Sequence, residues 1–166
     1  DEDDDVRVVI LTGSGDAFCA GADFSRGSAV FDRPSDGGFT ACPVSPTAWQ
    51  IRKPVIAAVN GHAIGIGLTL ALHCDIRVMA RQSKYGIVQV RRGVMPDAFS
   101  HWTLPRIAGM GAAADIVLTG RTFDGDEALR LGIASRVTDS LNVLTESPSN
   151  VRPVSMMSAA APIPAI

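Results

Sequence analysis

The sequence predicts a single α/β domain in which strands and helices alternate. Two observations support this prediction: short β-branched apolar runs alternate with segments of helical period, and the chain is long enough for only one such domain. Of its 166 residues, 46% are hydrophobic and 19% are charged, which suffices for one core and excludes two large domains.

The first half of the chain begins with a strand pattern at 6–12, "VRVVILT", which a Gly-Ser-Gly-Asp turn at 13–16 ends. Glycine, proline and serine are frequent over 23–53, so we expect a loop there, with at most a short helix at 47–52. The apolar run "VIAAVNG" at 55–61 predicts a second strand.

The second half shows two helical patterns after a third strand. We expect a helix from 67 to about 73 and a strand, "DIRVMA", at 75–80. A further helix is expected to start near 104 and to end at 120, and the last helix spans 124–131 with Gly132 after it.

The two ends of the chain do not follow this pattern. The chain opens with "DEDDD", an acidic run directly before the first strand, and residues 140–166 are rich in proline and have neither a helical nor a strand period. We therefore assign 1–139 to the folded core and expect 140–166 to be a disordered tail.

Composition argues against several classes of partner. A formal net charge of -2 provides no basic surface for a phosphate backbone, so we expect no nucleic acid. The cysteines Cys19, Cys42 and Cys74 are odd in number and lack CxxC spacing, so we expect neither a disulfide framework nor a metal site. The long apolar runs are interrupted and no signal sequence is recognisable, so we expect a cytoplasmic protein without a membrane partner.

Two loops that contain glycine are candidates for chemistry. "AFCAGAD" at 17–23 follows the first strand and its turn, and "NGHAIGIG" at 60–67 follows the second strand, so both leave carboxyl ends of strands, where α/β proteins bind ligands. Glycine permits positive φ, so turns at Gly21 and Gly65 can direct adjacent N–H groups outward and form an oxyanion hole. The alternative for each loop is that its small residues serve only helix-on-strand packing.

Taken in order, the motifs resemble the enoyl-CoA hydratase/isomerase (crotonase) family. They are "AFCAGADF", "KPVIAAVNGHAIGIGLTLALHCDIRV", "KYGIVQVRRGVMPDAFSHWTLPRIAG" and "LTGRTFDGDEALRLGIASRV", and the match runs almost continuously over 6–137. Members of this family normally have a further strand and helix before this region and further helices after it. The resemblance therefore implies a crotonase-like core, a superhelix of stacked ββα turns, that is incomplete at both its N- and C-termini.

The resemblance also implies a coenzyme A thioester as substrate. No separate cofactor is implied, because coenzyme A enters as part of the substrate, and the family usually forms homotrimers or hexamers of two trimers. In this family two backbone N–H groups hold the thioester oxygen, and the matching residues are Ala22 and Ile66. The family has glycine at the second position, but a backbone donor survives a change to isoleucine. We expect six neighbouring residues to contact the substrate: Ala20, Gly21, Asp23, Gly65, Thr69 and Gln89.

A hydratase of this family has two carboxylates where this sequence has Thr69 and Gln89. Adding water across a double bond needs a base for the water and an acid for Cα, and neither threonine nor glutamine exchanges a proton near neutral pH. The resemblance therefore favours isomerase-type chemistry over hydration.

One carboxylate remains in register. Asp97, in "GVMPDAFSHW", matches the glutamate of peroxisomal-type Δ3,Δ2-enoyl-CoA isomerases and the aspartate of dienoyl-CoA isomerases. A double-bond shift needs only one base, so Asp97 is the candidate catalytic residue. The alternative is that Asp97 is a helix N-cap, because proline followed by aspartate is common before a helix.

Three functional classes remain open at this point. They are an isomerase-type crotonase enzyme that uses Asp97, a non-catalytic relative that binds acyl-CoA, and an inactive truncated gene product. We expect His62 and His73 to be packed and hydrogen-bonded within apolar segments, and Trp102 to lie in the core.

Overall fold

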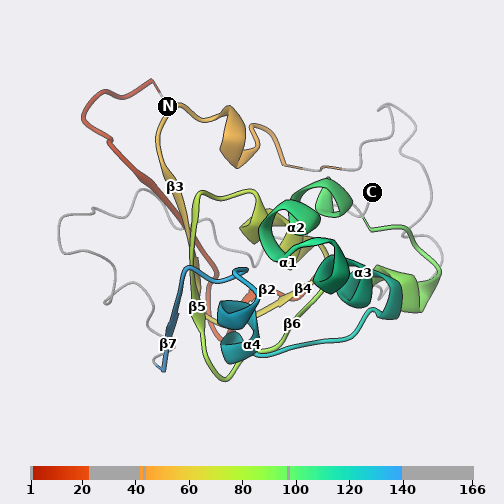
Figure 1. Cartoon of the computed structure of the whole chain (residues 1–166). Coiled ribbons are helices and arrows are strands. Elements are labelled where there is room, and N and C mark those ends of the chain that lie inside the picture. The colour runs from red at the N-terminus through yellow and green to blue at the C-terminus, as the bar shows by residue number, and fades with distance from the viewer. Residues whose placement is uncertain (1, 23–41, 43, 97, 140–166) are drawn as a thin grey trace.

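Two parallel β-sheets form the centre of this protein, as its computed structural model shows (Figure 1). The structure describes residues 2–22, 42, 44–96 and 98–139. The larger sheet has the strand order β1-β3-β5-β7 and the smaller sheet has the order β2-β4-β6. The strands are β1 Val9–Thr12, β2 Ala17–Cys19, β3 Val55–Val59, β4 His62–Ile64, β5 Ile76–Ala80, β6 Tyr85–Gly86 and β7 Arg136–Thr138. The predicted α/β class is confirmed.

The chain alternates between the two sheets. β1 is followed by β2, β3 by β4, and β5 by β6, so each strand of the larger sheet except β7 leads into a short strand of the smaller one. Helix α1, Ile66–Leu72, follows the second pair and packs against β2 and β4. This repeat of two strands and a helix is the pattern expected of a stacked ββα superhelix.

The main hydrophobic core lies between the sheets and the helices. β3 is buried along its whole length, so alternate residues serve opposite faces of the sheet. Ala57 and Val59 belong to the main core, whereas Ile56 and Ala58 form a smaller cluster with β1 and β5 on the other face. The largest side chains that are fully buried are Tyr85, Leu68, Met79, Ile87, Leu104, Ile116 and Ile133.

The helix expected at 104–120 is two helices. α2 spans Ser100–Ala108 and α3 spans Met110–Thr119, and they pack against each other (Figure 1). Gly109 separates them because its φ of +80° is not helical. α2 also starts earlier than expected, although Pro105 lies inside it. The buried side chains of Ser100, Thr103 and Leu104 hold this first part of α2 against the core.

The other helices lie close to their expected positions. α4 spans Gly125–Arg130, and the side chain of Asp124 caps it by accepting the Glu127 N–H. Two short 3-10 helices are η2, Ala48–Gln50, within the segment expected to be at most a short helix, and η3, Gln89–Arg92, which was not expected.

The strand expectations were right for the larger sheet and incomplete for the smaller one. β1 begins at Val9 instead of residue 6, whereas β3 and β5 lie where they were expected. The strands β2, β4, β6 and β7 were missed, because runs of two or three residues carry too little periodicity to be recognised. The tail assigned to 140–166 lies outside the described residues.

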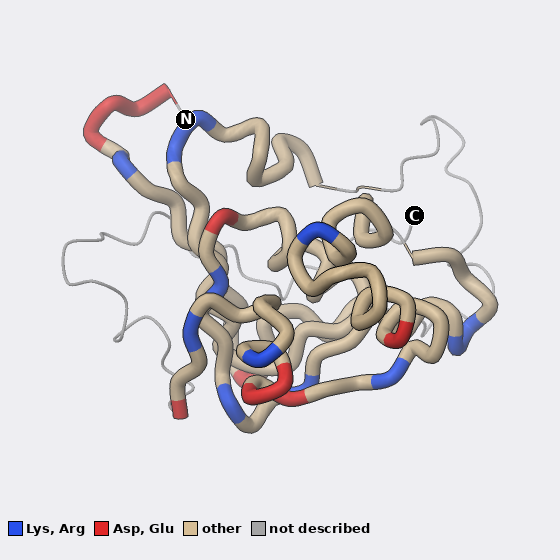
Figure 2. The backbone as a smooth tube through the Cα atoms, viewed as in Figure 1, with Lys and Arg blue, Asp and Glu red and all other residues tan. Residues whose placement is uncertain are grey.

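Surface charge gathers in ion pairs around α4 (Figure 2). Arg81 pairs with Asp126 and Asp139, and Arg121 pairs with Asp115 and Glu127. None of these carboxylates lies in the two glycine loops. The ion pairs therefore link surface segments near α4 and are not part of the candidate site.

The side chain of Asn60 joins the end of β3 to the turn between β1 and β2. Its Oδ1 accepts the Gly13 N–H at 3.0 Å, and its Nδ2 donates to the Gly15 carbonyl at 2.7 Å. Gly13 and Asn60 are buried, so the Gly13 N–H would have no water to replace the amide oxygen if the amide were removed, whereas Gly15 is exposed. Asn60 therefore holds the turn that precedes β2.

We predict that Asn60→Ala lowers the free energy of unfolding by about 1–3 kcal/mol, because the buried Gly13 N–H loses its partner. Urea denaturation followed by circular dichroism measures this change. Ser14→Ala is the control, since Ser14 lies in the same turn and is exposed. Equal midpoints for the two variants would contradict the role assigned to Asn60.

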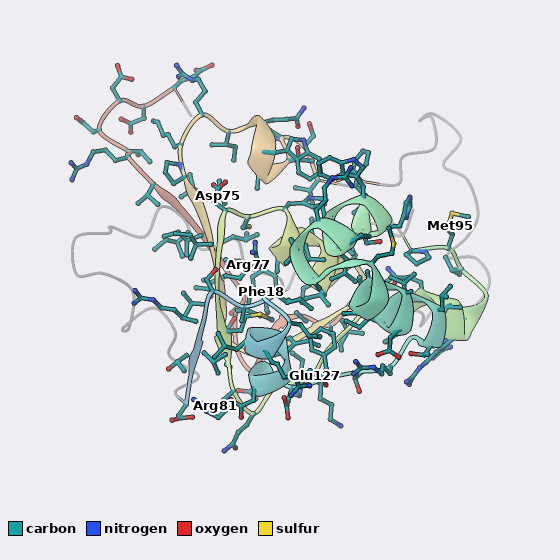
Figure 3. All side chains as sticks on the ribbon, viewed as in Figure 1. Phe18, Asp75, Arg77, Arg81, Met95 and Glu127 are labelled. Atoms are coloured by element: carbon teal, nitrogen blue, oxygen red, sulfur yellow. The ribbon has the colours of Figure 1, made fainter. Side chains whose placement is uncertain are left out.

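Arg77 is a buried arginine on β5. Its Nη1 donates to the Cys74 carbonyl at 2.6 Å, and its Nε donates to the Ile133 carbonyl in the segment between α4 and β7. Burial lowers the pKa of the guanidinium, because desolvation disfavours the charged form. Figure 3 shows Arg77 and Arg81 along the same part of the chain, with Arg81 at the outer end. Arg77 thus links β5 to the segment that leads into β7.

We predict that Arg77→Met lowers the free energy of unfolding by about 1–3 kcal/mol for each carbonyl left without a donor. Chemical denaturation of the full chain provides the measurement. Arg81→Met is the matched control, because it removes only exposed ion pairs and should shift the midpoint less. A larger effect at Arg81 than at Arg77 would refute this assignment.

Candidate active site

The first glycine loop leaves the carboxyl end of β2. Gly21 has a φ of +97°, which residues with a side chain rarely adopt. Ala20 and Ala22 on either side of it are exposed. The loop therefore presents its main chain to solvent at Ala22, whereas Asp23, which we expected to contact the substrate, lies outside the described residues.

The second glycine loop leaves the carboxyl end of β4. Gly65 has a φ of +58° and is the N-cap residue of α1. Ile66 is the first residue of that helix, where an N–H group has no acceptor within the helix. Among the described residues, only Ala98 and Phe99 combine a side chain with positive φ, so Ile66 has a backbone conformation that does not require glycine.

The structure brings the two loops into main-chain contact. A Cβ atom placed on Gly21 would lie 3.0 Å from the Ile64 carbonyl oxygen. A Cβ atom on Gly67 would overlap the carbonyl and Cβ of Cys19. Both glycines are therefore needed for close approach, and the packing alternative is correct for Gly67. The same contact places the residues after β2 beside the first turn of α1, as an oxyanion hole requires.

Neutral side chains occupy the two positions where a hydratase has carboxylates. Thr69 is fully buried, and its hydroxyl donates to the Ile66 carbonyl at 2.9 Å. The Gln89 side chain lies beside the second loop, with its amide nitrogen 3.7 Å and its amide oxygen 3.9 Å from the position of a Cβ on Gly65. The structure thus groups Thr69 and Gln89 with Gly65 and Ile66, and neither side chain can act as an acid or a base near neutral pH.

Asp97 lies outside the described residues, but the chain on both sides of it is described. α2 begins at Ser100, and Phe99 is its N-cap residue. The catalytic role and the N-cap role expected for Asp97 therefore both stay predictions.

The two residues that follow Asp97 form a strained bend. Ala98 has a φ of +46° and Phe99 a φ of +58°, in the left-handed region that non-glycine residues avoid. Such conformations cost about 1–3 kcal/mol each and persist only where surrounding contacts impose them. Sequence reasoning missed this bend, because alanine and phenylalanine have no preference for positive φ.

A buried histidine contacts the bend. His73 is the C-cap residue of α1, and its Nε2 lies 2.6 Å from the Ala98 carbonyl oxygen. A carbonyl only accepts, so Nε2 carries the proton. Burial lowers the pKa of His73 by desolvation, and the hydrogen bond with Ala98 opposes this shift in part. The expectation that His73 is packed and hydrogen-bonded is confirmed.

The expectation for His62 was right only for its hydrogen bond, and the expectation for Trp102 was wrong. His62 is exposed instead of packed, although its Nδ1 accepts the Lys84 N–H at 2.9 Å. Trp102 is 56% exposed, because α2 turns this face away from the core, and its ring stacks under the Arg106 guanidinium.

Other reactive groups in the described part of the chain do not form a second centre. Cys74 is buried, and desolvation raises the pKa of its thiol to about 12, so it is not a nucleophile at neutral pH. Within the described residues, no group of three or more His, Cys, Asp and Glu side chains is arranged to hold a metal ion. No helix in that same part of the chain is long and apolar enough to cross a membrane.

Comparisons with known sequences agree with this geometry. A family model described as enoyl-CoA hydratase/isomerase matches residues 1–159. The chain is 39% identical over 165 residues to the probable enoyl-CoA hydratase echA8 of Mycobacterium tuberculosis, covering 97% of this chain and 62% of that protein. It is 35% identical over 138 residues to the peroxisomal bifunctional enzyme of Cavia porcellus, covering 83% of this chain and 19% of that protein. The chain spans less than two thirds of the length of either relative.

Solved structures show the same fold. A probable enoyl-CoA hydratase/isomerase from Mycobacterium abscessus is 51% identical with a TM-score of 0.83, over 88% of this chain and 56% of that one. An enoyl-CoA hydratase from Bacillus anthracis is 34% identical with a TM-score of 0.74, over 87% of this chain and 57% of that one. The crotonase-like core expected from the sequence motifs is confirmed. Its alternating strands, its glycine loops and the match over 1–159 place this chain in the enoyl-CoA hydratase/isomerase family.

Proposed function

We propose that this chain binds an acyl-CoA thioester in an oxyanion hole formed by the backbone N–H groups of Ala22 and Ile66. The observation that carries the proposal is the contact between the two glycine loops, in which Gly21 packs against the Ile64 carbonyl. The thioester oxygen accepts both N–H groups. When an enolate forms, these fixed dipoles stabilise its negative charge without reorganisation.

The proposed reaction moves a double bond from C3 to C2 of an enoyl-CoA. The Asp97 carboxylate removes a proton from C2, and the electron pair moves into the thioester to give a dienolate. The proton then returns at C4 while the double bond forms between C2 and C3. No water, oxidant or second acid is consumed, so a single carboxylate suffices.

The neutral residues beside the hole favour this reaction over hydration. The Thr69 hydroxyl donates its hydrogen bond to the Ile66 carbonyl, and Gln89, beside Gly65, has no group that ionises near neutral pH. A hydratase needs proton transfer to or from both positions, whereas the double-bond shift needs it from neither.

One observation supports Asp97 as the base. The strained bend at Ala98 and Phe99 follows Asp97 directly, and strain of this kind is typical of functional sites.

The proposal includes a homotrimer or a hexamer in the cytoplasm. Large apolar side chains are exposed on and near α2 and α3, where Figure 2 shows few charged residues. Burial of this surface between copies of the chain would protect it from water. The exposed apolar residues are Met95, Phe99, Trp102, Met110 and Leu118. All three cysteines lie in the described part of the chain and none forms a disulfide there, which suits a reducing compartment.

We predict that Gly21→Val and Gly65→Val each weaken the binding of a saturated acyl-CoA by about tenfold or more. Both positions have positive φ, where a β-branched residue costs more than the 1.4 kcal/mol that equals a factor of ten. Calorimetric titration measures the dissociation constants.

Gly109→Val is the matched control for this titration. Gly109 has a φ of +80°, but no atom lies within 4 Å of a Cβ at that position, and it separates α2 from α3 away from both loops. It should lose a similar amount of stability and still bind acyl-CoA. A folded wild type that gives no heat with acyl-CoA, or equal weakening in all three variants, would remove the hole from the proposal.

We predict that Asp97→Asn abolishes conversion of a 3-enoyl-CoA to its 2-enoyl isomer while acyl-CoA still binds. Asparagine keeps the shape of aspartate but cannot accept a proton, and loss of a general base costs about 10²–10⁴ in rate. Hydration of crotonyl-CoA should be slow already in the wild type. Ultraviolet absorbance of the conjugated thioester follows both reactions.

The same assays separate the remaining alternatives. Ordinary hydratase turnover would contradict the argument from Thr69 and Gln89. Wild type that binds acyl-CoA but shows no isomerisation, or an Asp97→Asn variant with unchanged turnover, would favour the non-catalytic acyl-CoA-binding relative. Wild type that neither binds nor turns over substrate would favour the inactive gene product.

A further inference from the structure

The end of α1 and the start of α2 meet at one hydrogen bond. His73 at the C-cap of α1 donates its Nε2–H to the Ala98 carbonyl, at 2.6 Å, and His73 is buried. Ala98 directly follows Asp97 and precedes the N-cap residue Phe99. The bond therefore joins the helix that begins at the proposed oxyanion hole to the segment that carries the proposed base.

The aromatic side chain of Trp49 packs against both His73 and the same bend. The Trp49 ring lies 4.2 Å from the His73 ring and 5.4 Å from the Phe99 ring, measured between centroids. Its contact with Phe99 is edge-to-face, at 79° between the planes, a favourable geometry for aromatic pairs. His73 and Trp49 thus contact Ala98 and Phe99, the two residues with unfavourable positive φ.

We propose that His73 is a positioning residue: by donating to the Ala98 carbonyl it holds the Ala98–Phe99 bend, which directly follows Asp97 in the chain, in its left-handed conformation. This inference rests on the proposed function for its catalytic half. Two consecutive non-glycine residues at positive φ do not keep that conformation unaided, so an external contact has to impose it. The hydrogen bond from His73 is such a contact, and the adjacent ring of Trp49 limits movement of the imidazole.

His73 is suited to this role and not to proton transfer. Its Nε2–H donates a hydrogen bond to a carbonyl oxygen, and a carbonyl oxygen does not become protonated near neutral pH. Desolvation lowers the pKa of the ring, so the neutral tautomer with the proton on Nε2 persists at neutral pH. A neutral donor in a buried site keeps the bend the same while substrate enters and leaves.

Three substitutions at residue 73 test the inference in the full chain. His73→Leu removes the donor, His73→Asn keeps an amide that is too short to reach the Ala98 carbonyl, and His73→Gln places an amide N–H where Nε2 stood. The matched control is His101→Leu, because His101 is an exposed histidine on α2 with no recorded contact to the bend.

We expect these variants to differ in kcat and not in their affinity for acyl-CoA. We expect His73→Leu and His73→Asn to lose about a hundredfold in kcat for the isomerisation, the effect of misplacing a catalytic group by about 1 Å. The KM and the dissociation constant of a saturated acyl-CoA should stay unchanged, and His73→Gln should recover most of the kcat. If His73→Leu does not fold, the Asn and Gln pair decides. Unchanged kcat in His73→Asn, or no recovery in His73→Gln, would overturn the proposal.

Hydrogen exchange tests the bend without any activity. The N–H groups of Trp102 and Thr103 both donate to the Phe99 carbonyl, so their exchange reports on the start of α2. We expect about tenfold faster exchange in His73→Asn than in His73→Gln or His101→Leu. Equal exchange in all three refutes the bend-holding role whether or not the wild type is an isomerase. If exchange is faster in His73→Asn but the wild type is not an isomerase, the proposed function fails and the catalytic role of His73 fails with it. The bend-holding role of His73 is then still supported.

Discussion

Close main-chain contact at glycine is the constraint on which the rest of this structure depends. A side chain at Gly61 would overlap the Asp16 carbonyl, one at Gly67 would overlap Cys19, and one at Gly21 would press on Ile64. Without side chains at these three points, β2 can lie beside β4 and α1 can pack onto β2. The smaller sheet exists because of these contacts, and the two loops of the proposed oxyanion hole are the ends of its strands.

Buried polar groups complete this arrangement where apolar packing alone would leave the register open. Asn60 satisfies both a donor and an acceptor in the turn before β2, and Arg77 satisfies two carbonyls near the edge of the larger sheet. Each group is costly to bury unless its partners are in place, so each specifies one geometry. The stacked turns are therefore held by specific hydrogen bonds as well as by the core.

The chemistry of the site follows from what surrounds the hole. In the proposed reaction, backbone N–H groups of the two loops stabilise negative charge, while the side chains of Thr69 and Gln89 supply no proton. One carboxylate in register, at Asp97, suffices for a reaction that returns the proton it removes. The bend after Asp97 is costly in backbone energy, and His73 and Trp49 meet it from neighbouring elements.

The sequence by itself determined the family, the long buried strands β3 and β5, and the identity of every candidate side chain, because β-branched runs and ordered glycine motifs are local signals. It also determined that Thr69 and Gln89 are neutral, since that depends on residue type alone. Only the tertiary structure decided the strands of two or three residues, the break between α2 and α3 at Gly109, and the exposure of Trp102. Only it revealed the bend at Ala98 and Phe99 and the histidine that meets it, because positive φ at these residues is imposed by contacts with distant parts of the chain and leaves no mark in the local sequence.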